Sequence, residues 1–310
     1  MTITLAGGIT FFGITLSPPP IEAGWFGGGY NASFRSTVDR ITYATDTATA
    51  SVRGPLSVAK YKLAAAGNTT DGWFGGGYPN ASQVDRITYV TDTATASVRG
   101  PLSAGRYQLA AAGNTTAGWF GAGVDNGVTK STVDRITYAT DTATASVRGP
   151  LSLARYNLAA VGNSDYGWFG GGQAVSGQTL SSVNRITFAT DTATASVRGP
   201  LSLARYQLAA VGNDTDGWFG GGVDGSYFST VQRITYATDT ATASVRGPLS
   251  SVRAVMGAAG NTTDGWFGGG SSPIFSTVDR ITYATDTATA SVRGPLSSAR
   301  EYLAAASGIQ

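Results

Sequence analysis

The sequence predicts an all-β protein, a six-bladed β-propeller of four-stranded blades that closes on itself. The first observation is a unit that recurs six times, with spacings of 46 to 50 residues between successive GWFG strings. A period of about 40–50 residues is typical of propeller blades. The second is the string TDTATASVRGPLS, which is present six times without change. The GWFG tryptophans are Trp25, Trp73, Trp119, Trp168, Trp218 and Trp266.

The position at which the repeat is cut is the third observation. The first unit opens at GWFGGG, residues 24–29, which is halfway through the repeat. The last unit ends with AREYLAAASG, residues 299–308, which is the half that the first unit lacks. A linear array has capped ends rather than complementary ones. We therefore expect the C-terminal strand to pair with the N-terminal blade, with residues 23–310 as the propeller and residues 1–22 as an arm.

Three of the four strands follow from local patterns. GWFGGG is typical of a short strand that ends in glycines, which permit positive φ. VDRITYAT alternates and is rich in Val, Ile, Thr and Tyr, which favour strands. TATASVRGPL predicts a further extended run after a tight turn at TDT, and its Pro indicates the end of that strand.

The block SLARYQLAAVGN has two interpretations. Its Ala and Leu content and its Gly-Asn stop fit a short helix. We favour a strand, because the innermost strands of six blades converge on one axis, where only small side chains such as those of LAAVG fit. The bulkier Ile, Tyr and Val of the other strands suit the wider outer part of the blade.

Composition excludes several classes of site. The 310 residues include no Cys and no His, which excludes disulfides, thiolate or imidazole metal sites and Ser-His or Cys-His nucleophile pairs within this sequence. Lys and Arg number 21 and Asp and Glu 19. The basic residues recur at repeated positions between acids, whereas nucleic-acid binding needs them clustered. We expect no metal, no cofactor, no nucleic-acid partner and no enzymatic activity.

The order of these elements resembles the kelch repeat over about residues 23–308. The glycines of GWFGGG resemble the kelch double glycine, and the Arg that opens the first strand and the aromatic residue of the third also match. The chain departs from kelch in carrying its Trp in the second strand rather than the fourth. The resemblance implies a propeller. Units this uniform and rich in Gly, Thr and Ala also resemble repeats of virion proteins of tailed phages, cyanophages in particular.

Residues 1–22 lie outside the repeat. MTITLAGGITFFGITL is uncharged and has a Gly-Gly turn signal, which favours a hairpin. It lacks the basic region of a secretory signal and is too short and irregular to cross a membrane. Pro18, Pro19 and Pro20 then predict a stiff extended spacer. The arm either docks on another chain or folds back on its own propeller.

The charged residues of the repeats have structural interpretations first. Arg and Asp of the VDR and TDT motifs are expected to pair across neighbouring strands. Asn184 and Gln232 replace the VDR aspartate in two units, and an acid copied around a ring does not make one unique active site. Six cations open the ARYQ blocks, and they either hold the blades together or form an anion-binding ring. They are Lys60, Arg106, Arg155, Arg205, Arg253 and Arg300.

The units differ most between the glycine run and the VDR strand. The kelch resemblance implies that these loops share one face with the connections between blades. Exposed aromatics and amides there suit contacts with proteins or glycans, and neutral drift is the alternative. The candidate binding residues are Tyr30, Asn31, Phe34, Tyr78, Asn80, Asp125, Asn126, Gln173, Gln178, Asp224, Tyr227, Phe228 and Phe275.

These observations favour a structural or binding protein of a phage virion, a tail, fibre or surface component assembled in the host cytoplasm. The arm would attach it to other virion proteins, and the variable loops would act in particle assembly or contact a host surface protein or glycan. The alternative is a soluble carbohydrate-binding propeller. A copper oxidase of the kelch type would need His and a Cys-modified Tyr, which this composition excludes.

Overall fold

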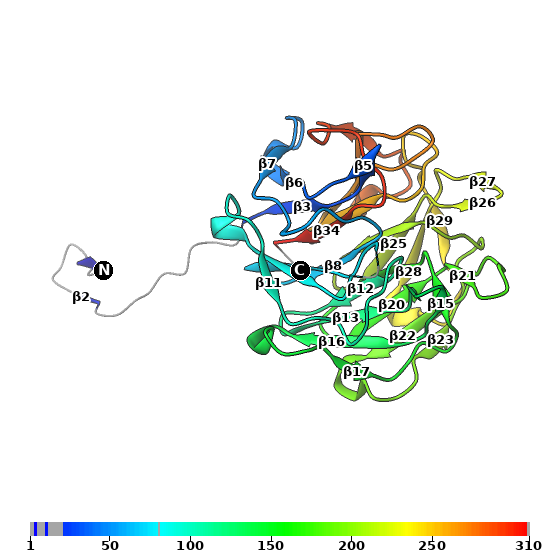
Figure 1. The fold of residues 1–310 in the computed structure, drawn as a ribbon. Coiled ribbons are helices and arrows are strands. Elements are labelled where there is room, and N and C mark those ends of the chain that lie inside the picture. The colour runs from blue at the N-terminus through cyan, green and yellow to red at the C-terminus, as the bar shows by residue number, and fades with distance from the viewer. Residues whose placement is uncertain (1–2, 5–9, 12–20, 80, 309–310) are drawn as a thin grey trace.

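The computed structural model describes residues 3–4, 10–11, 21–79 and 81–308. Six four-stranded antiparallel sheets follow one another around a ring, which confirms the predicted six-bladed β-propeller (Figure 1). Within each blade, the second strand pairs with both the first and the third, and the third pairs with the fourth.

The strands have the following bounds. The inner strands are β34 (Ala304–Ser307), β8 (Ala64–Gly67), β12 (Ala110–Gly113), β19 (Ala159–Gly162), β24 (Ala209–Gly212) and β30 (Gly257–Gly260). The second strands are β3 (Ala23–Gly27), β9 (Asp71–Gly75), β13 (Ala117–Gly121), β20 (Tyr166–Gly170), β25 (Asp216–Gly220) and β31 (Asp264–Gly268). The third strands are β6 (Val38–Thr42), β10 (Val84–Thr88), β16 (Val133–Thr137), β22 (Val183–Thr187), β28 (Val231–Thr235) and β32 (Val278–Thr282). The outer strands are β7 (Ser51–Arg53), β11 (Ser97–Arg99), β17 (Ser146–Arg148), β23 (Ser196–Arg198), β29 (Ser244–Arg246) and β33 (Ser291–Arg293).

Short strand pairs lie outside the blades. In the arm, β1 (Ile3–Thr4) pairs with β2 (Thr10–Phe11), which agrees with the expected hairpin. On the propeller the pairs are β4 (Tyr30–Asn31) with β5 (Ser33–Phe34), β14 (Val124–Asp125) with β15 (Val128–Thr129), β18 (Arg155–Tyr156) with β21 (Gln173–Ala174), and β26 (Val223–Asp224) with β27 (Ser226–Tyr227).

The ring closes where the sequence predicts. Strand β34, the last strand described, pairs antiparallel with β3, and Ala306 lies opposite Trp25. It is the inner strand of the first blade, so the two ends of the chain complete one sheet, as the blue and red strands of Figure 1 show. No separate cap is needed.

The inner strands are shorter than predicted and the helical alternative is not adopted. Only the Ala-Ala-Ala-Gly part of the block is extended in β8, and the ARYQ-type residues before it are irregular. Crowding around the axis explains the small side chains. A Cβ added to Gly118 would lie 3.0 Å from the Cβ of Ala66 in the preceding blade, so larger residues would push the blades apart.

The outer strands are also shorter than predicted. After β6 the chain enters the 3-10 helix η1 (Tyr43–Thr45) and a turn, and only Ser51–Arg53 remain extended as β7. The same arrangement follows each third strand, with η2 (Tyr89–Thr91), η3 (Tyr138–Thr140), η4 (Phe188–Thr190), η5 (Tyr236–Thr238) and η6 (Tyr283–Thr285). This wide turn carries the TDT aspartate to the neighbouring blade.

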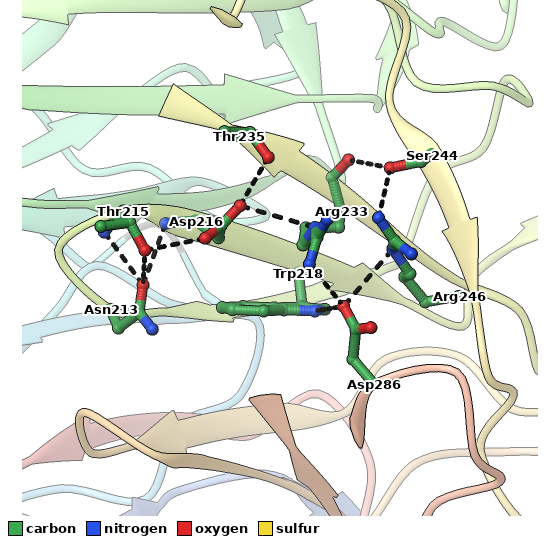
Figure 2. Close-up of polar contacts among 9 residues, drawn as sticks. All are labelled: Asn213, Thr215, Asp216, Trp218, Arg233, Thr235, Ser244, Arg246 and Asp286. Atoms are coloured by element: carbon green, nitrogen blue, oxygen red, sulfur yellow. Dashed lines mark hydrogen bonds and ion pairs between the residues drawn. The ribbon is translucent and has the colours of Figure 1, made fainter. Parts of the chain in front are cut away.

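One buried carboxylate joins each pair of blades, as Figure 2 shows for the fifth and sixth. Asp286 Oδ2 accepts a hydrogen bond of 2.8 Å from Trp218 Nε1 and lies 3.2 Å from Arg233 Nη1. Arg246 Nε lies 3.4 Å from the same oxygen. The expectation that these pairs form between neighbouring strands is wrong, because the acid comes from the next blade.

The contact repeats around the whole ring. The Trp-to-Asp bonds are Trp25–Asp92, Trp73–Asp141, Trp119–Asp191, Trp168–Asp239, Trp218–Asp286 and Trp266–Asp46, each 2.8 or 2.9 Å long. Each tryptophan also stacks on an aromatic ring of the next blade, for example Trp218 on Tyr283 with centroids 3.9 Å apart. The hydrophobic core is therefore six similar layers between blades.

We predict that Gly149→Ala lowers the free energy of unfolding by about 3 kcal/mol. The N–H of Gly149 donates to Asp191 O at 2.8 Å, and an added Cβ would lie 2.0 Å from Ala193 O. The control is Gly127→Ala, where φ is +80° and no atom lies within 4 Å, so only backbone strain of about 1 kcal/mol is expected. Denaturant unfolding measures both, and equal losses would contradict the close approach.

We further predict that alkaline destabilisation depends on the stacked tyrosines. Burial raises the pKa of Tyr138, which stacks on Trp73, whereas Phe188 occupies the equivalent position of the next blade. The unfolded chain releases this proton at about pH 10 while the folded chain holds it, so stability is intact below about pH 10 and falls as pH rises further. Tyr138→Phe keeps the stack and should make that fall shallower. Unfolding free energies across this pH range measure it, and unchanged slopes would contradict it.

Candidate functional site

The blades present two different faces. Tight turns join the inner and second strands at one face, at residues 68–70, 114–116, 163–165, 213–215 and 261–263; we call it the turn face. The variable loops and the segments that lead into the inner strands meet at the opposite face, the loop face. Backbone bridges join the two kinds of segment there, for example Tyr61 with Tyr78. This is the arrangement that the sequence implied.

Six residues form a closed ring of backbone hydrogen bonds around the axis at the loop face. Each N–H donates to the carbonyl of the preceding member, at 2.7–2.9 Å, and the last link runs from the N–H of Lys62 to Tyr302 O. We call this set the axial ring: Lys62, Gln108, Asn157, Gln207, Val255 and Tyr302. The bonds satisfy backbone groups that would otherwise face the axis unpaired.

All six members of the axial ring adopt left-handed backbone conformations, with φ between 55° and 60°. Such angles are unfavourable for non-glycine residues, most of all for the β-branched Val255. Strain of this kind persists only where the surroundings hold it, and it is common at functional sites. The ring and the apolar residue that follows each member line an axial cavity of about 70 Å³.

An aromatic cluster lies beside the ring on the first three blades. We define it as Tyr30, Phe34, Tyr61, Tyr78, Tyr107 and Tyr302. Tyr61 is central: its centroid lies 5.0 Å from that of Phe34, 5.4 Å from that of Tyr78 and 5.8 Å from that of Tyr302. Phe34 and Tyr78 are 40% and 39% exposed, so part of the cluster's apolar ring surface faces solvent.

Polar groups border the cluster. Lys62 Nζ lies 5.0 Å from the ring centroid of Tyr302 and 5.1 Å from that of Tyr61, and burial lowers the pKa of this ammonium. Gln207 Nε2 donates to Tyr302 Oη at 2.8 Å, and burial raises the pKa of Tyr302 to about 12. Burial also raises the pKa of Glu301. The site thus combines ring faces, hydroxyls, one amide and one charge of each sign.

The structure brings three of the predicted residues together, since Tyr30, Phe34 and Tyr78 all belong to the aromatic cluster. Tyr227 is 39% exposed and is close enough to the cluster to contribute to the raised pKa of Tyr302. Asn80 lies outside the described residues.

The other predicted residues make contacts within their own loops or with neighbouring segments of the loop face. Asn31 Nδ2 donates to Ala299 O at 2.9 Å, and Thr179 Oγ1 donates to Asp224 at 2.9 Å. Asp125 accepts from Asn126 at 3.0 Å and lies 3.7 Å from Lys130 Nζ. Gln173 belongs to β21, and the backbone oxygen of the exposed Gln178 accepts from Ala174 N. Phe228 and Phe275 lie over the guanidinium groups of Arg205 and Arg253.

Four residues of the site were not predicted from the sequence, because their block was assigned to the interior of a strand: Tyr61, Lys62, Tyr107 and Tyr302. A signal was present for Lys62 and Tyr302. The residue two places after each block-opening cation varies among Lys, Gln, Asn, Val and Tyr, although the residues around it are nearly uniform. Variation inside a uniform segment marked the axial ring.

Each of the six block-opening cations is buried within its own blade, and none lines the axis. Four pair with the VDR aspartate, as Arg106 does with Asp134 at 2.7 Å and Lys60 with Asp85 at 3.1 Å. All six are at most 1% exposed. Where Asn184 removes the acid, Arg155 donates to backbone carbonyls such as Ser182 O at 3.0 Å, and burial lowers its pKa to about 10. The anion-ring alternative is therefore wrong.

At the turn face, the inner strands and their turns line an axial cavity of about 180 Å³. Asn114, Asn163 and Asn213 each use Oδ1 to hold their own turn and Nδ2 to reach the next turn. Among the residues that the structure describes, no three acidic groups gather as a metal site would require. The same part of the chain contains no helix long and apolar enough to cross a membrane.

Comparison with known proteins identifies the fold and no family. No family model matches the chain, and no curated protein matches it. A solved structure, "Structure of YjhT", is similar. It matches with a TM-score of 0.67 and 12% sequence identity, over 81% of this chain and 88% of that chain. At this identity, the match shows the propeller fold alone. The fold is compatible with a binding protein.

The comparison corrects one expectation. The composition led us to expect no enzymatic activity, and the similarity to the propeller YjhT contradicts that expectation. The exclusion is therefore wrong, because absence of Cys and His removes particular chemistries and not catalysis on this fold. The distant match assigns no reaction to this chain.

We predict that the amides of the axial ring exchange with solvent as slowly as those of the strands, although the ring residues lie outside the blade sheets. Opening one ring hydrogen bond requires two blades to separate. Hydrogen exchange followed by mass spectrometry or NMR measures it, with the exposed residues of the variable loops as the fast-exchanging reference. Loop-like exchange at Gln108 and Gln207 would contradict the ring.

Proposed function

We propose that this protein is a binding protein that contacts another macromolecule through the aromatic cluster, as a structural component of a phage virion. The setting rests on the resemblance of its uniform repeats to those of phage virion proteins. The contact serves particle assembly or attachment to the host, and the protein is assembled into the particle in the host cytoplasm.

The aromatic cluster is the observation that carries the proposal. Tyrosine and phenylalanine give large contact areas at a small cost in side-chain entropy, and such residues dominate the energetics of interfaces. Here the rings pack on one another, so little ordering is left for the moment of binding. Phe34 and Tyr78 keep exposed ring surface that no neighbouring blade covers.

A carbohydrate is the second candidate partner, and the mixture of groups in the site favours it. The exposed ring surfaces of Phe34 and Tyr78 suit stacking against sugar rings. The Gln207 amide and the Tyr302 hydroxyl, bonded to each other at 2.8 Å, would orient sugar hydroxyls, as a few placed polar groups do in ligand sites. A free carbohydrate-binding propeller would use the same surface without a particle.

The test is a paired replacement in the full chain. We predict that Phe34→Ala with Tyr78→Ala weakens incorporation into particles or adsorption to host cells by about tenfold or more, as expected for loss of central aromatic contacts. Val175→Ala is the control, because Val175 is 73% exposed on the same face but belongs to another loop.

The outcomes separate the candidates. Weaker particle incorporation or host adsorption in the paired variant supports the virion role. Normal incorporation and adsorption, with loss of retention on a glycan array, supports the carbohydrate-binding protein. A paired variant that folds and matches the control in all three assays would overturn the proposed function.

A further inference from the structure

The arm contains a run of prolines, a sequence of the kind that aromatic surfaces bind in other proteins. Pro18, Pro19 and Pro20 directly precede Ile21, where the continuous described chain begins. Consecutive prolines favour a polyproline II helix, whose backbone is already ordered before binding. Grooves lined with aromatic residues recognise such segments. Among the described residues of the loop face, the aromatic cluster is the surface of this kind.

The arm joins the propeller at the turn face, whereas the aromatic cluster of the same chain lies at the loop face. Ile21 O accepts from Ala23 N, and Glu22 O accepts from Tyr43 N, at the end of the first blade that borders the turn face. The proline triplet lies within about 10 Å of Ile21, since each residue spans at most about 3.6 Å. Strand β3 alone carries the chain about 13 Å toward the loop face, and the cluster lies beyond its end.

Charge supports the same pairing. Glu22 is exposed beside the proline triplet. Lys62 borders the aromatic cluster. Within the described chain Glu301 is the carboxylate that acts on its ammonium, at longer range than an ion pair. An acid that follows the prolines would meet this cation at the edge of the aromatic surface.

We propose that the segment Ser17–Glu22 of one copy docks on the aromatic cluster of a second copy. The turn face of the first copy then lies against the loop face of the second. Such a contact joins two different surfaces, so each copy can bind one neighbour through its arm and another through its cluster. It therefore builds open head-to-tail stacks rather than closed dimers. The inference rests on the proposed function, because it names the partner of the same surface.

Self-association of the full chain tests the proposal. In sedimentation velocity, the wild-type chain should form species that grow with concentration. An arm variant, in which Pro18, Pro19 and Pro20 are all replaced by Ser, should associate at least tenfold more weakly. The cluster variant, Phe34→Ala with Tyr78→Ala, should do the same, and Val175→Ala should match wild type. A monomeric wild type at every soluble concentration would overturn the proposal.

Mixing the two defective chains is the sharper test. The arm variant keeps its cluster and the cluster variant keeps its arm, so one productive contact remains and the mixture should form one-to-one dimers and nothing larger. A mixture that stays monomeric, although circular dichroism shows both chains folded, would overturn the docking.

A charge exchange gives an independent readout if the cluster variant does not fold. Lys62→Glu should weaken the stacks at least tenfold, and adding Glu22→Lys should restore them. Failure to restore them overturns the placement of the arm beside Lys62. The arm variant also separates the two proposals: if it loses stacking but still binds particles, cells or glycans, the proposed function stands; if it stacks like wild type, only the inference fails.

Discussion

A single buried carboxylate between each pair of blades is the interaction on which the ring depends. Asp46 and its five equivalents are 5–8% exposed, and each receives an indole N–H and faces two guanidinium groups from the preceding blade. A buried carboxylate is costly unless its oxygens are paired. Each blade therefore needs its neighbour to complete its own turn, and the sixth needs the first.

The crowding of the axis is the second constraint. Six inner strands converge there, and their small residues leave narrow cavities rather than a wide pore. On the loop face, each residue of the axial ring adopts a left-handed backbone conformation, and its N–H donates to the carbonyl of the preceding member. The result is a closed circular frame whose backbone repeats six times while its side chains differ. The aromatic cluster lies beside that frame and shares Tyr302 with it.

The closed ring of six blades could be predicted well from the sequence, but the residues of the aromatic cluster only in part. Repeat length, the complementary halves and the alternation of VDRIT are all local or periodic, so strands such as β6 and the closing strand β34 could be predicted. The partner of the TDT aspartate could not, because nothing local distinguishes a strand neighbour from a blade neighbour. Tyr61 and Tyr107 come from one kind of segment and Phe34 and Tyr78 from another, and only the curvature of the ring brings their rings into contact.

The pairing of β34 with β3 has a consequence for how the protein is made. Trp25 is 0% exposed in the finished ring, yet the inner strand of its blade, β34, lies about 280 residues further along the chain. At about 5–20 residues per second, the ribosome needs about 15 to 55 seconds between the two strands. Throughout that time the inner edge of the first blade lacks β34, and an unpaired strand edge is a template for pairing with another chain. Translation on crowded polysomes is therefore the stage at which copies of this propeller risk exchanging their closing strands.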